Sequence, residues 1–184
     1  MVIVSVRDAS FDDAVAIARI YRPHVEQSVA SFEDEAPDAA AIRARMSSTP
    51  SLPWLVAEHV GEGVVGYAYA AAHRSRAAYR WAVDCSVYLD AKARGLGIGK
   101  RLYAELLPVL QGLGYFRAYA GVTLPNAASV ALHESMGFRP VGIYAKVGYK
   151  HGAWHDVGWW QLSLHDDAEA GALPDPKPWR SAGA

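Results

Sequence analysis

The sequence predicts a mixed α/β (α+β) domain in which an antiparallel meander feeds a strand–helix–strand–helix unit, with helices on both faces of the sheet. Two apolar segments, 54–60 and 64–72, predict the meander, because they flank the tight turn 61–63 (Gly-Glu-Gly) in the pattern of a β-hairpin. A glycine-rich turn and a helical segment, 98–111, follow the meander and lead into a further short strand, which is typical of a crossover connection.

The N-terminal part predicts one strand and two helices. A short apolar segment, 2–6, is interpreted as a strand. Ser10 followed by Asp13 has the pattern of a capping box, and the apolar residues after it recur at helical spacing. A second short helix is expected over 38–46, where good helix formers lie between two prolines.

The rest of the chain supplies the other strands and helices. A third strand is expected over 79–89, after the basic connection 73–76. Asn126 is placed to cap a helix over 127–136, and Gly137 to end it. The remaining expected elements are a strand over 118–122, final strands over 138–143 and 157–164, a polar and aromatic connection between those two, and an irregular tail.

The composition excludes several functions. The chain has 18 Lys and Arg against 19 Asp and Glu, and this net charge of −1 argues against a general nucleic-acid binder or a polybasic membrane binder. Cys85 is the only cysteine, which excludes an internal disulfide framework or multi-cysteine metal cluster and favours the cytoplasm. Apolar runs such as 64–72 are well short of the roughly 20 residues of a membrane span, so no membrane anchor is expected. We therefore interpret the chain as one domain, 1–164, followed by the tail, 165–184.

A glycine-rich loop, Arg94 to Lys100, lies between a predicted strand and a predicted helix. Glycines let backbone N–H groups approach an anion, and the start of a helix adds positive potential. The cations Arg94 and Lys100 favour a pyrophosphate over the alternative, a turn that only links strand to helix. Arg94 stands where a Walker A loop needs glycine, and position 100 lacks the last glycine of the dinucleotide fingerprint. Neither a nucleoside triphosphatase nor hydride transfer is therefore favoured.

The loop and its surroundings resemble a known superfamily. The pattern Arg94-x-x-Gly97-x-Gly99 after the strand 86–89 resembles the acetyl-CoA pyrophosphate loop of the GNAT N-acyltransferases, and Asn126-x-x-Ser129 followed by His133 resembles the next helix. The resemblance covers roughly residues 2–164 and implies the GNAT fold, a mixed, mostly antiparallel sheet with helices on both faces. The segments that resemble the phosphinothricin N-acetyltransferase branch are Arg76-x-Ala78-Tyr79-x-Trp81, Ser86-Val87-Tyr88, Gly121-x-x-Leu124-Pro125-Asn126 and Lys150-His151-Gly152-x-Trp154-His155-Asp156-Val157.

The resemblance implies acetyl-CoA as the co-substrate. The backbone of Val87, Tyr88 and Leu89 would hold the pantetheine arm like an added strand and polarise the thioester carbonyl, although the side chains of Val87 and Leu89 also suit an ordinary core. Asn126 would contact a cofactor amide or the substrate, or act only as a helix cap. The other cofactor-binding residues that the resemblance implies are Arg94, Gly95, Leu96, Gly97, Ile98, Gly99, Lys100 and Ser129.

Two residues are implied to be catalytic. Asp84 stands where this branch commonly carries Glu as the proposed general base. It would assist the loss of a proton from the substrate amine directly, through water or by its charge alone, because an ordinary Asp, with a pKa of about 3.9, is too acidic for efficient direct transfer. The alternative is a strand-end carboxylate paired with Arg76 or Arg80. His133 would bond the sulfur or relay a proton to the thiolate, and the alternative for it is a structural histidine.

The expected acceptor is a small amino acid analogue, with phosphinothricin and methionine sulfoximine or sulfone leading, acetylated directly on its α-amino group. Arg74 and Arg76 offer planar donors that match a carboxylate or phosphinate, whereas a solvated hairpin tip is the alternative. Acetylation of a peptide N-terminus or polyamine, and acetyl-CoA binding without catalysis, stay open. A homodimer is expected from the family. The implied substrate-binding residues are Phe32, Arg74, Ser75, Arg76, Asp84 and Ser86.

His151, His155 and Asp156 are metal-ligating residue types within six positions. Gly152 and the neighbouring strand pattern argue against the helix that would align them, so no metal is expected. Cys85 has no identifiable base partner, and no covalent acyl-enzyme is expected.

Overall fold

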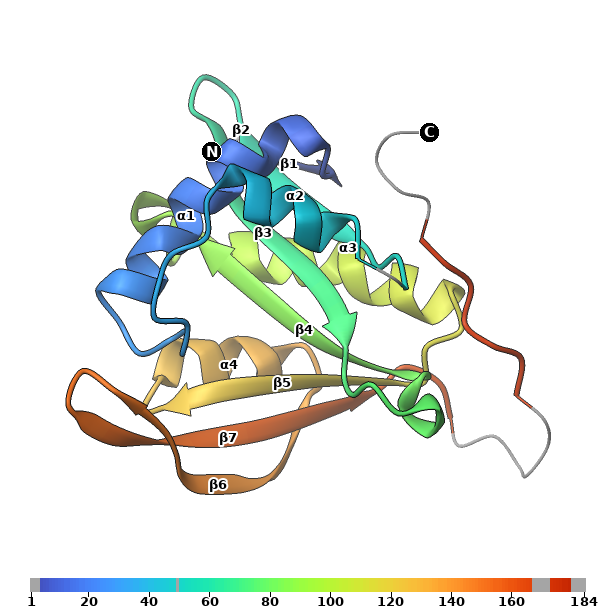
Figure 1. Ribbon diagram of the computed structural model, residues 1–184. Coiled ribbons are helices and arrows are strands. Elements are labelled where there is room, and N and C mark those ends of the chain that lie inside the picture. Colours follow the sequence, from blue (N-terminus) through green and yellow to red (C-terminus); the bar gives the residue numbers. More distant parts are fainter. Residues whose placement is uncertain (1–3, 49, 167–172, 180–184) are drawn as a thin grey trace.

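The computed structural model describes residues 4–48, 50–166 and 173–179, and it confirms the predicted fold class. Its seven strands form a single sheet in the order β1-β2-β3-β4-β5-β7-β6, in which the described strands all pair antiparallel except β4 with β5 (Figure 1). The strands are β1 (Val4–Asp8), β2 (Trp54–His59), β3 (Gly63–Ala72), β4 (Ala82–Leu89), β5 (Arg117–Leu124), β6 (Arg139–Lys150) and β7 (Ala153–Ser163). The helices are α1 (Ala14–Glu26), α2 (Ala39–Met46), α3 (Ile98–Gly112) and α4 (Ala127–Ser135), with 3-10 turns η1 (Phe11–Asp13), η2 (Ala77–Tyr79) and η3 (Ala91–Ala93).

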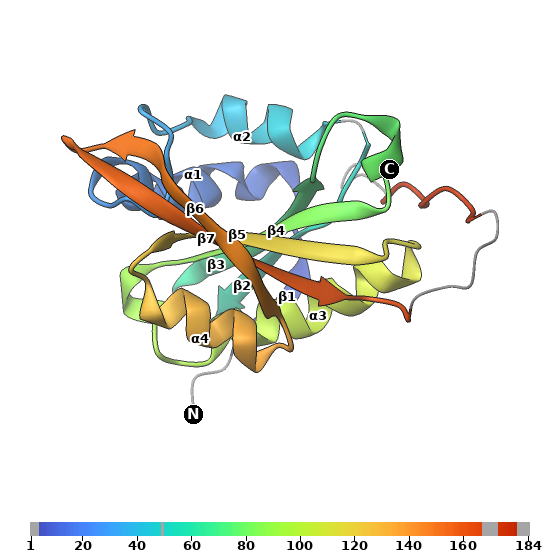
Figure 2. The ribbon, with the colours of Figure 1, turned by 90° about the horizontal axis from the view of Figure 1, so that it is seen from below.

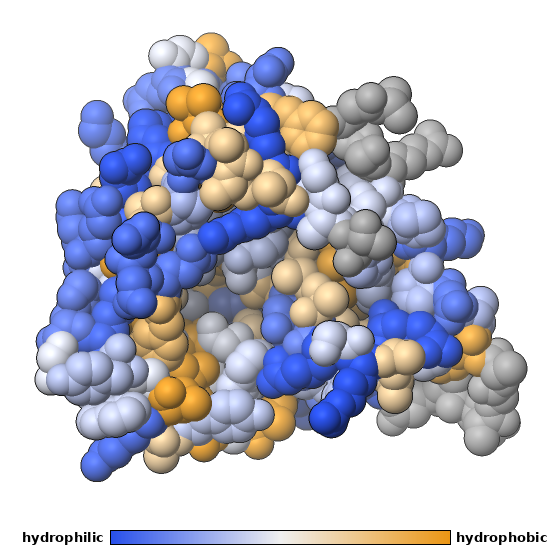
Figure 3. Space-filling model, viewed as in Figure 1, coloured by the Kyte–Doolittle hydropathy of each residue, from blue (hydrophilic) through white to orange (hydrophobic). Residues whose placement is uncertain are grey.

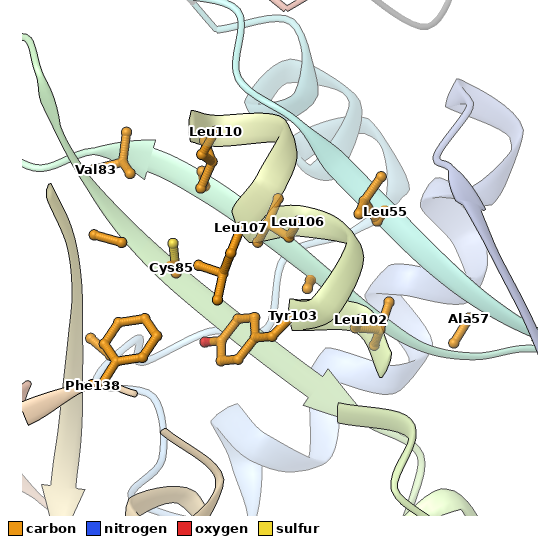
Figure 4. Packing of buried hydrophobic residues seen from close by; sticks show 14 of the residues in the cluster. Leu55, Ala57, Val83, Cys85, Leu102, Tyr103, Leu106, Leu107, Leu110 and Phe138 are labelled. Atoms are coloured by element: carbon orange, nitrogen blue, oxygen red, sulfur yellow. The ribbon is translucent and has the colours of Figure 1, made fainter. Parts of the chain in front are cut away.

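The helices cover both faces of the sheet. In Figure 2, α1 and α2 lie on one side of the strands and α3 and α4 on the other. Leu102, Leu106 and Leu110 recur every four residues on α3 and are fully buried against the sheet (Figure 4). Burying each such side chain stabilises the fold by about 1.5–3 kcal/mol. The second core lies under α1 and α2 and contains the aromatic residues of β2 and β3.

Strand β4 contributes to both cores because its side chains alternate. Val83 and Cys85 are buried in the core under α3 (Figure 4). Tyr88 packs against the core under α1. By the same alternation Asp84 and Ser86 share the face of Tyr88. The catalytic candidate Asp84 therefore lies on the α1 face of the sheet.

The pairing of β4 with β5 is short, and this positions the site. Parallel pairs join Ala82–Asp84 to residues 117–119, and the last of them is Asp84 with Tyr119. Beyond that pair the two strands diverge (Figure 1). Further along, β4 pairs only with β3 and β5 only with β7.

The predicted starts of the helices are confirmed. The Asp13 carboxylate accepts hydrogen bonds from the backbone N–H (2.7 Å) and the hydroxyl (3.1 Å) of Ser10, and this capping box leads through η1 into α1. Asp38 caps α2, and Asn126 caps α4 by accepting from the backbone N–H of Ser129 at 3.1 Å. Each cap satisfies a backbone donor that a helix start otherwise leaves unpaired.

Two predicted elements are wrong in extent. The strand expected to begin at residue 79 begins at Ala82, because the residues before it form the turn η2. The polar and aromatic connection expected between 143 and 157 is mostly strand, since β6 and β7 extend to a tight turn at His151 and Gly152. β6 is an edge strand with most of its residues exposed, so its side chains do not show the apolar alternation by which a half-buried strand is identified.

Part of the predicted tail packs on the domain. The N–H of Lys177 donates to the carbonyl of Leu113 at 2.8 Å, and that of Trp179 to the carbonyl of Ser51 at 3.0 Å. The predicted strand residues 2–3 and tail residues 167–172 and 180–184 lie outside the described part. In the described part, none of the helices has the length and apolar character required to cross a membrane.

Candidate active site

A cleft of about 620 Å³ opens where β4 and β5 separate. The molecular surface is recessed between the β3–β4 part of the sheet and the β5–β7 part (Figure 3). Four segments that are distant in sequence line the cleft: the end of α1 and its following loop, the last half of β4, the glycine loop with the start of α3, and β5 with α4. The separation of two neighbouring strands thus creates a long channel that reaches the middle of the sheet.

One wall of the cleft is an open strand edge. Val87, Tyr88 and Leu89 line it and pair only with β3, so the side of β4 that β5 covers at Asp84 is available here to an extended ligand. Ser86 lines the same wall. The structure thus places the predicted pantetheine-binding backbone along the cleft.

The glycine loop forms the end wall. Gly95 and Gly97 both have φ of +75°, a conformation that L side chains rarely adopt, and the space where a Cβ would lie is open at both. Gly97 directly precedes α3, whose first N–H groups carry positive potential. Arg94 and Lys100, the two cations of the loop, also line the cleft. The loop therefore has the backbone donors and the charge that suit a pyrophosphate.

The other loop residues have different positions. Ile98 is buried, and Gly99 lies so close to α4 that a Cβ would meet Leu132 at 3.1 Å, so Gly99 allows α3 and α4 to pack closely. Both residues line the cleft, together with Asn126 and Ser129 of α4. Leu96 is 51% exposed and, unlike the other predicted cofactor residues, is not part of the lining.

Asp84 pairs with a residue that the sequence analysis did not single out. Its Oδ1 lies 2.6 Å from Nδ1 of His73, which follows the end of β3. Burial raises the pKa of Asp84, and His73 and the positive charge of Arg74 oppose that rise. The expected alternative partner Arg80 instead pairs with Asp175 at 2.6 Å. The antiparallel pairing of β3 with β4 could have indicated this neighbour, because it brings the residue that follows β3 next to the start of β4.

His133 lies on α4 with both ring nitrogens occupied. Nδ1 is 2.7 Å from the carbonyl oxygen of Ser129, and Nε2 is 2.9 Å from the hydroxyl of Tyr103. A carbonyl only accepts, so Nδ1 carries the proton, and in the neutral ring Nε2 accepts from Tyr103. Burial lowers the pKa of His133, which favours this neutral form. The ring lines the cleft without a free nitrogen in this arrangement.

The other predicted substrate residues, Phe32, Arg74, Ser75 and Arg76, are not part of the cleft lining. The guanidinium of Arg74 lies over the ring of Trp159, with Cζ 5.7 Å from the ring centroid. Ser75 and Arg76 are exposed in the connection before η2. Phe32 packs against β6, where its ring fills the space that a Cβ at Gly148 would need.

Lys150 ties the end of β6 to the loop that carries Phe32. Its ammonium is buried and donates to three backbone carbonyls, those of Val25 (2.6 Å), Ser31 (2.6 Å) and Glu33 (3.0 Å). Beside it, the Glu33 carboxylate makes a two-pronged ion pair with Arg45 at 2.8 and 2.7 Å. A hydrogen bond from Arg45 is the largest cause of a lowered pKa at Glu33. The sequence shows Lys150 only as part of a motif, with no pattern that predicts this burial.

His155 and Asp156 of the β6–β7 hairpin have structural partners. His155 Nε2 lies 3.0 Å from the carbonyl of Lys150, and Asp156 accepts a hydrogen bond from the N–H of Lys146 at 2.7 Å, where β6 bulges. Within the described residues no three His, Cys, Asp or Glu side chains are grouped to hold a metal ion. Cys85 is buried, and burial raises the pKa of its thiol, which makes it a poor nucleophile.

Comparison with known proteins agrees with this geometry. The model of the acetyltransferase (GNAT) family matches residues 16–138, which is more than half of the chain. The chain is a member of the GNAT family. This confirms the resemblance drawn from the motifs, and the protein is accordingly an N-acetyltransferase.

Relatives of this GNAT enzyme include two curated acetyltransferases. It is 39% identical over 181 residues to the phosphinothricin N-acetyltransferase of Streptomyces viridochromogenes, with 94% of this chain and 92% of the relative covered. It is 34% identical over 167 residues to the L-methionine sulfoximine/L-methionine sulfone acetyltransferase of Salmonella typhimurium, with 90% and 97% covered. The crystal structure of a GNAT superfamily phosphinothricin acetyltransferase from Sinorhizobium meliloti in complex with AcCoA matches with a TM-score of 0.85 at 37% identity, covering 95% of this chain and 93% of that one.

Proposed function

We propose that this GNAT enzyme transfers acetyl from acetyl-CoA directly to the α-amino group of a small amino acid analogue, with phosphinothricin and methionine sulfoximine or sulfone as the leading acceptors. One observation carries the proposal: the open edge of β4 runs from the glycine loop to Asp84, the last residue of β4 that pairs with β5. Asp84 directly precedes the part of β4 that lines the cleft. A donor bound along that edge would therefore bring its acyl group close to the Asp84 carboxylate. The names of the relatives support the choice of donor and acceptor.

The residues of the cleft fit acetyl-CoA. Gly95, Gly97 and the first N–H groups of α3 would receive the pyrophosphate, with Arg94 and Lys100 beside it. The backbone of Val87–Leu89 would pair with the pantetheine amides, and a free N–H of this edge would stabilise the negative charge that develops on the thioester oxygen.

Asp84 would assist deprotonation of the acceptor amine. Burial raises the pKa of its carboxyl, which brings it closer to the range useful for a base than an ordinary Asp. His133 would attend the leaving thiol as the family resemblance implies. Its two hydrogen bonds mean that Tyr103 would have to release Nε2 before the imidazole could bond sulfur.

The acceptor chamber would lie on the α1 face, beside Asp84. Arg74 and Arg76 would attract an acceptor with a second anionic group, which argues against a polyamine, since a polyamine needs an acidic pocket. Phe32 and Ser86 would line the same chamber from the α1–α2 loop and from β4.

The predicted homodimer stays a prediction, for which the exposed apolar side chains of β6 and β7 offer a surface: Val141, Ile143, Tyr144, Val147, Tyr149 and Trp154.

The reaction is tested by acetyl-CoA-dependent thiol release across a panel of acceptors, with the product identified by mass. The panel contains phosphinothricin, methionine sulfoximine, methionine sulfone, ordinary amino acids, polyamines and short peptides. We expect saturable acetylation of phosphinothricin or methionine sulfoximine. Turnover only of peptides or polyamines would contradict the acceptor class, and acetyl-CoA binding without turnover of any amine would favour the non-catalytic module.

The pyrophosphate site predicts the effect of losing Arg94. Replacing Arg94 with Ala is expected to weaken acetyl-CoA binding about 10-fold, because one charge-assisted hydrogen bond to a phosphate contributes roughly 1.5 kcal/mol. The affinity is measured by calorimetry at two salt concentrations, and the variant should show the weaker salt dependence. Arg139→Ala, at an exposed position on β6, serves as the control and should bind acetyl-CoA like the parent. Equal affinity of both variants would remove Arg94 from the site.

A further inference from the structure

The His73–Asp84 pair has the geometry of a catalytic dyad. The short contact of 2.6 Å commits Nδ1 of His73 to the Asp84 carboxylate. Both side chains are partly enclosed, with His73 13% and Asp84 29% exposed. A carboxylate that holds one imidazole nitrogen fixes the orientation of the ring and stabilises its protonated form. The pair is therefore better suited to accept a proton than Asp84 alone.

Aromatic rings hold the His73 ring in place. It stacks on Tyr119 of β5 with centroids 4.4 Å apart and planes inclined by 19°. The rings of Tyr79 and Trp159 make T-shaped contacts with it, with ring centroids 6.0 and 5.9 Å away. Among the hydrogen bonds of the described residues none uses His73 Nε2, so that nitrogen is the one left to meet a ligand. A locked ring with one free nitrogen is the arrangement that a general base requires.

The pair lies where the donor edge meets the α1 face. Asp84 and Tyr119, which bracket His73, form the last pair before β4 and β5 separate. On the β5 side, Gly121 lines the cleft, and the Trp159 ring lies so close to it that a Cβ there would meet the ring at 3.2 Å. Trp159 in turn faces His73. His73 thus contacts Trp159, which touches the cleft wall at Gly121. It also contacts Asp84, which directly precedes the wall residue Cys85.

We propose that His73 is the residue that takes the proton from the acceptor amine, with Asp84 as its positioning and charge-stabilising partner. This inference rests on the acetyl transfer proposed above and names the base for it. The shorter Asp at position 84 then has a physical explanation, since the imidazole spans the distance between the carboxylate and the acceptor.

The proton and the bonds balance without a further reactant. The acceptor ammonium gives one proton to Nε2 of His73, and Asp84 stabilises the imidazolium. The free amine then forms the C–N bond to the acetyl carbon while the C–S bond breaks. The nitrogen loses a second proton as the thiolate takes one up, and His73 returns its proton to solvent, so one proton is released for each acetyl group transferred.

The described groups that surround the His73 ring come from several elements. Asp84 faces the ring from β4, Tyr119 from β5 and Tyr79 from η2, and Arg74 follows His73 in the chain and lies over Trp159 of β7. Asp84 favours the imidazolium and Arg74 opposes it.

The test is chemical rescue of His73→Ala in the thiol-release assay. We expect kcat near pH 7 to fall about 100-fold with the affinity for acetyl-CoA unchanged, as for loss of a general base. Added imidazole should restore turnover, and substituted imidazoles should do so in proportion to their basicity. His165→Ala, whose ring lies against Phe116, is the control and should neither lose turnover nor respond to imidazole. If the Ala variant does not fold, His73→Phe replaces it in the test. Phe keeps a ring for stacking on Tyr119, and this variant should show the same loss of kcat.

The outcomes separate this inference from the proposed function. A parent enzyme that acetylates no member of the acceptor panel refutes the acetyl transfer and the base together. An active parent with His73→Ala or His73→Phe within about threefold of its kcat refutes the base alone. A raised KM for the acceptor with kcat unchanged, or a fall in the kcat of His73→Ala that no imidazole restores, also refutes the base and shows that His73 only shapes the acceptor chamber.

Discussion

Replacing Asp84 with Asn is expected to lower kcat by roughly 10²- to 10⁴-fold, the range associated with loss of general acid–base catalysis. Asn keeps an oxygen that can accept the hydrogen bond from His73, but it lacks the charge that stabilises a protonated imidazole. The affinity for acetyl-CoA should stay within about twofold, because the lining of the cleft begins one residue later, at Cys85. Steady-state kinetics and calorimetry measure the two effects.

The same substitution should make the protein more stable at neutral pH. Burial raises the pKa of Asp84 in the folded state, so the folded protein binds a proton there more tightly than the unfolded chain does. The proton that Asp84 binds more tightly in the folded state therefore stabilises the protein fully below the unfolded pKa of about 4. This stabilisation is lost as the pH rises through the folded pKa of Asp84. Asn carries no charge, so the variant should unfold at a higher temperature than the parent at pH 7–8, with the difference vanishing toward pH 4.

Asp12→Asn provides the control for both effects, since Asp12 is exposed before α1. It should change neither kcat nor the unfolding temperature appreciably. An Asp84→Asn variant that retains the parental kcat would exclude the carboxylate from the mechanism. A lower unfolding temperature at pH 8 would mean that the hydrogen bond between Asp84 and His73 outweighs the cost of burying the Asp84 carboxylate.

Replacing Lys150 with Met is expected to destabilise the fold by about 2–4 kcal/mol. Met fills a similar volume but donates no hydrogen bond, and the carbonyls of Val25, Ser31 and Glu33 lose the ammonium that they share. Each buried acceptor left without a partner costs about 1–3 kcal/mol, and some of these will find another donor. Denaturant unfolding measures the change in free energy.

The loss should also be visible in the kinetics. Lys150 holds the loop that carries Phe32, so the KM of the acceptor should rise more than the Kd of acetyl-CoA. Lys146→Met is the matched control, because Lys146 lies on the same strand with its side chain exposed. A Lys150→Met variant as stable as that control would show that the three carbonyls are satisfied without the ammonium.

The agreement between sequence and structure depends on the range of the interactions. The capping box at Ser10 and Asp13, the cap at Asn126 and the hairpin at 61–63 involve residues within a few positions of one another, and each is found as expected. The extent of β6 was underestimated, because an exposed edge strand does not need alternating apolar residues. The glycine loop was recognised from its composition, since positive φ angles and helix N-termini leave a local signature.

The sequence by itself determined the family, the fold class and the residues of the glycine loop, since these depend on local pattern and on motif order. Only the tertiary structure decided which groups meet in space. It paired Asp84 with His73 instead of Arg76 or Arg80, engaged both nitrogens of His133, and buried Lys150 against a loop more than 100 residues away in sequence. Such contacts depend on strand register and on the packing of distant segments, and neither is specified by the residues next to them in the chain.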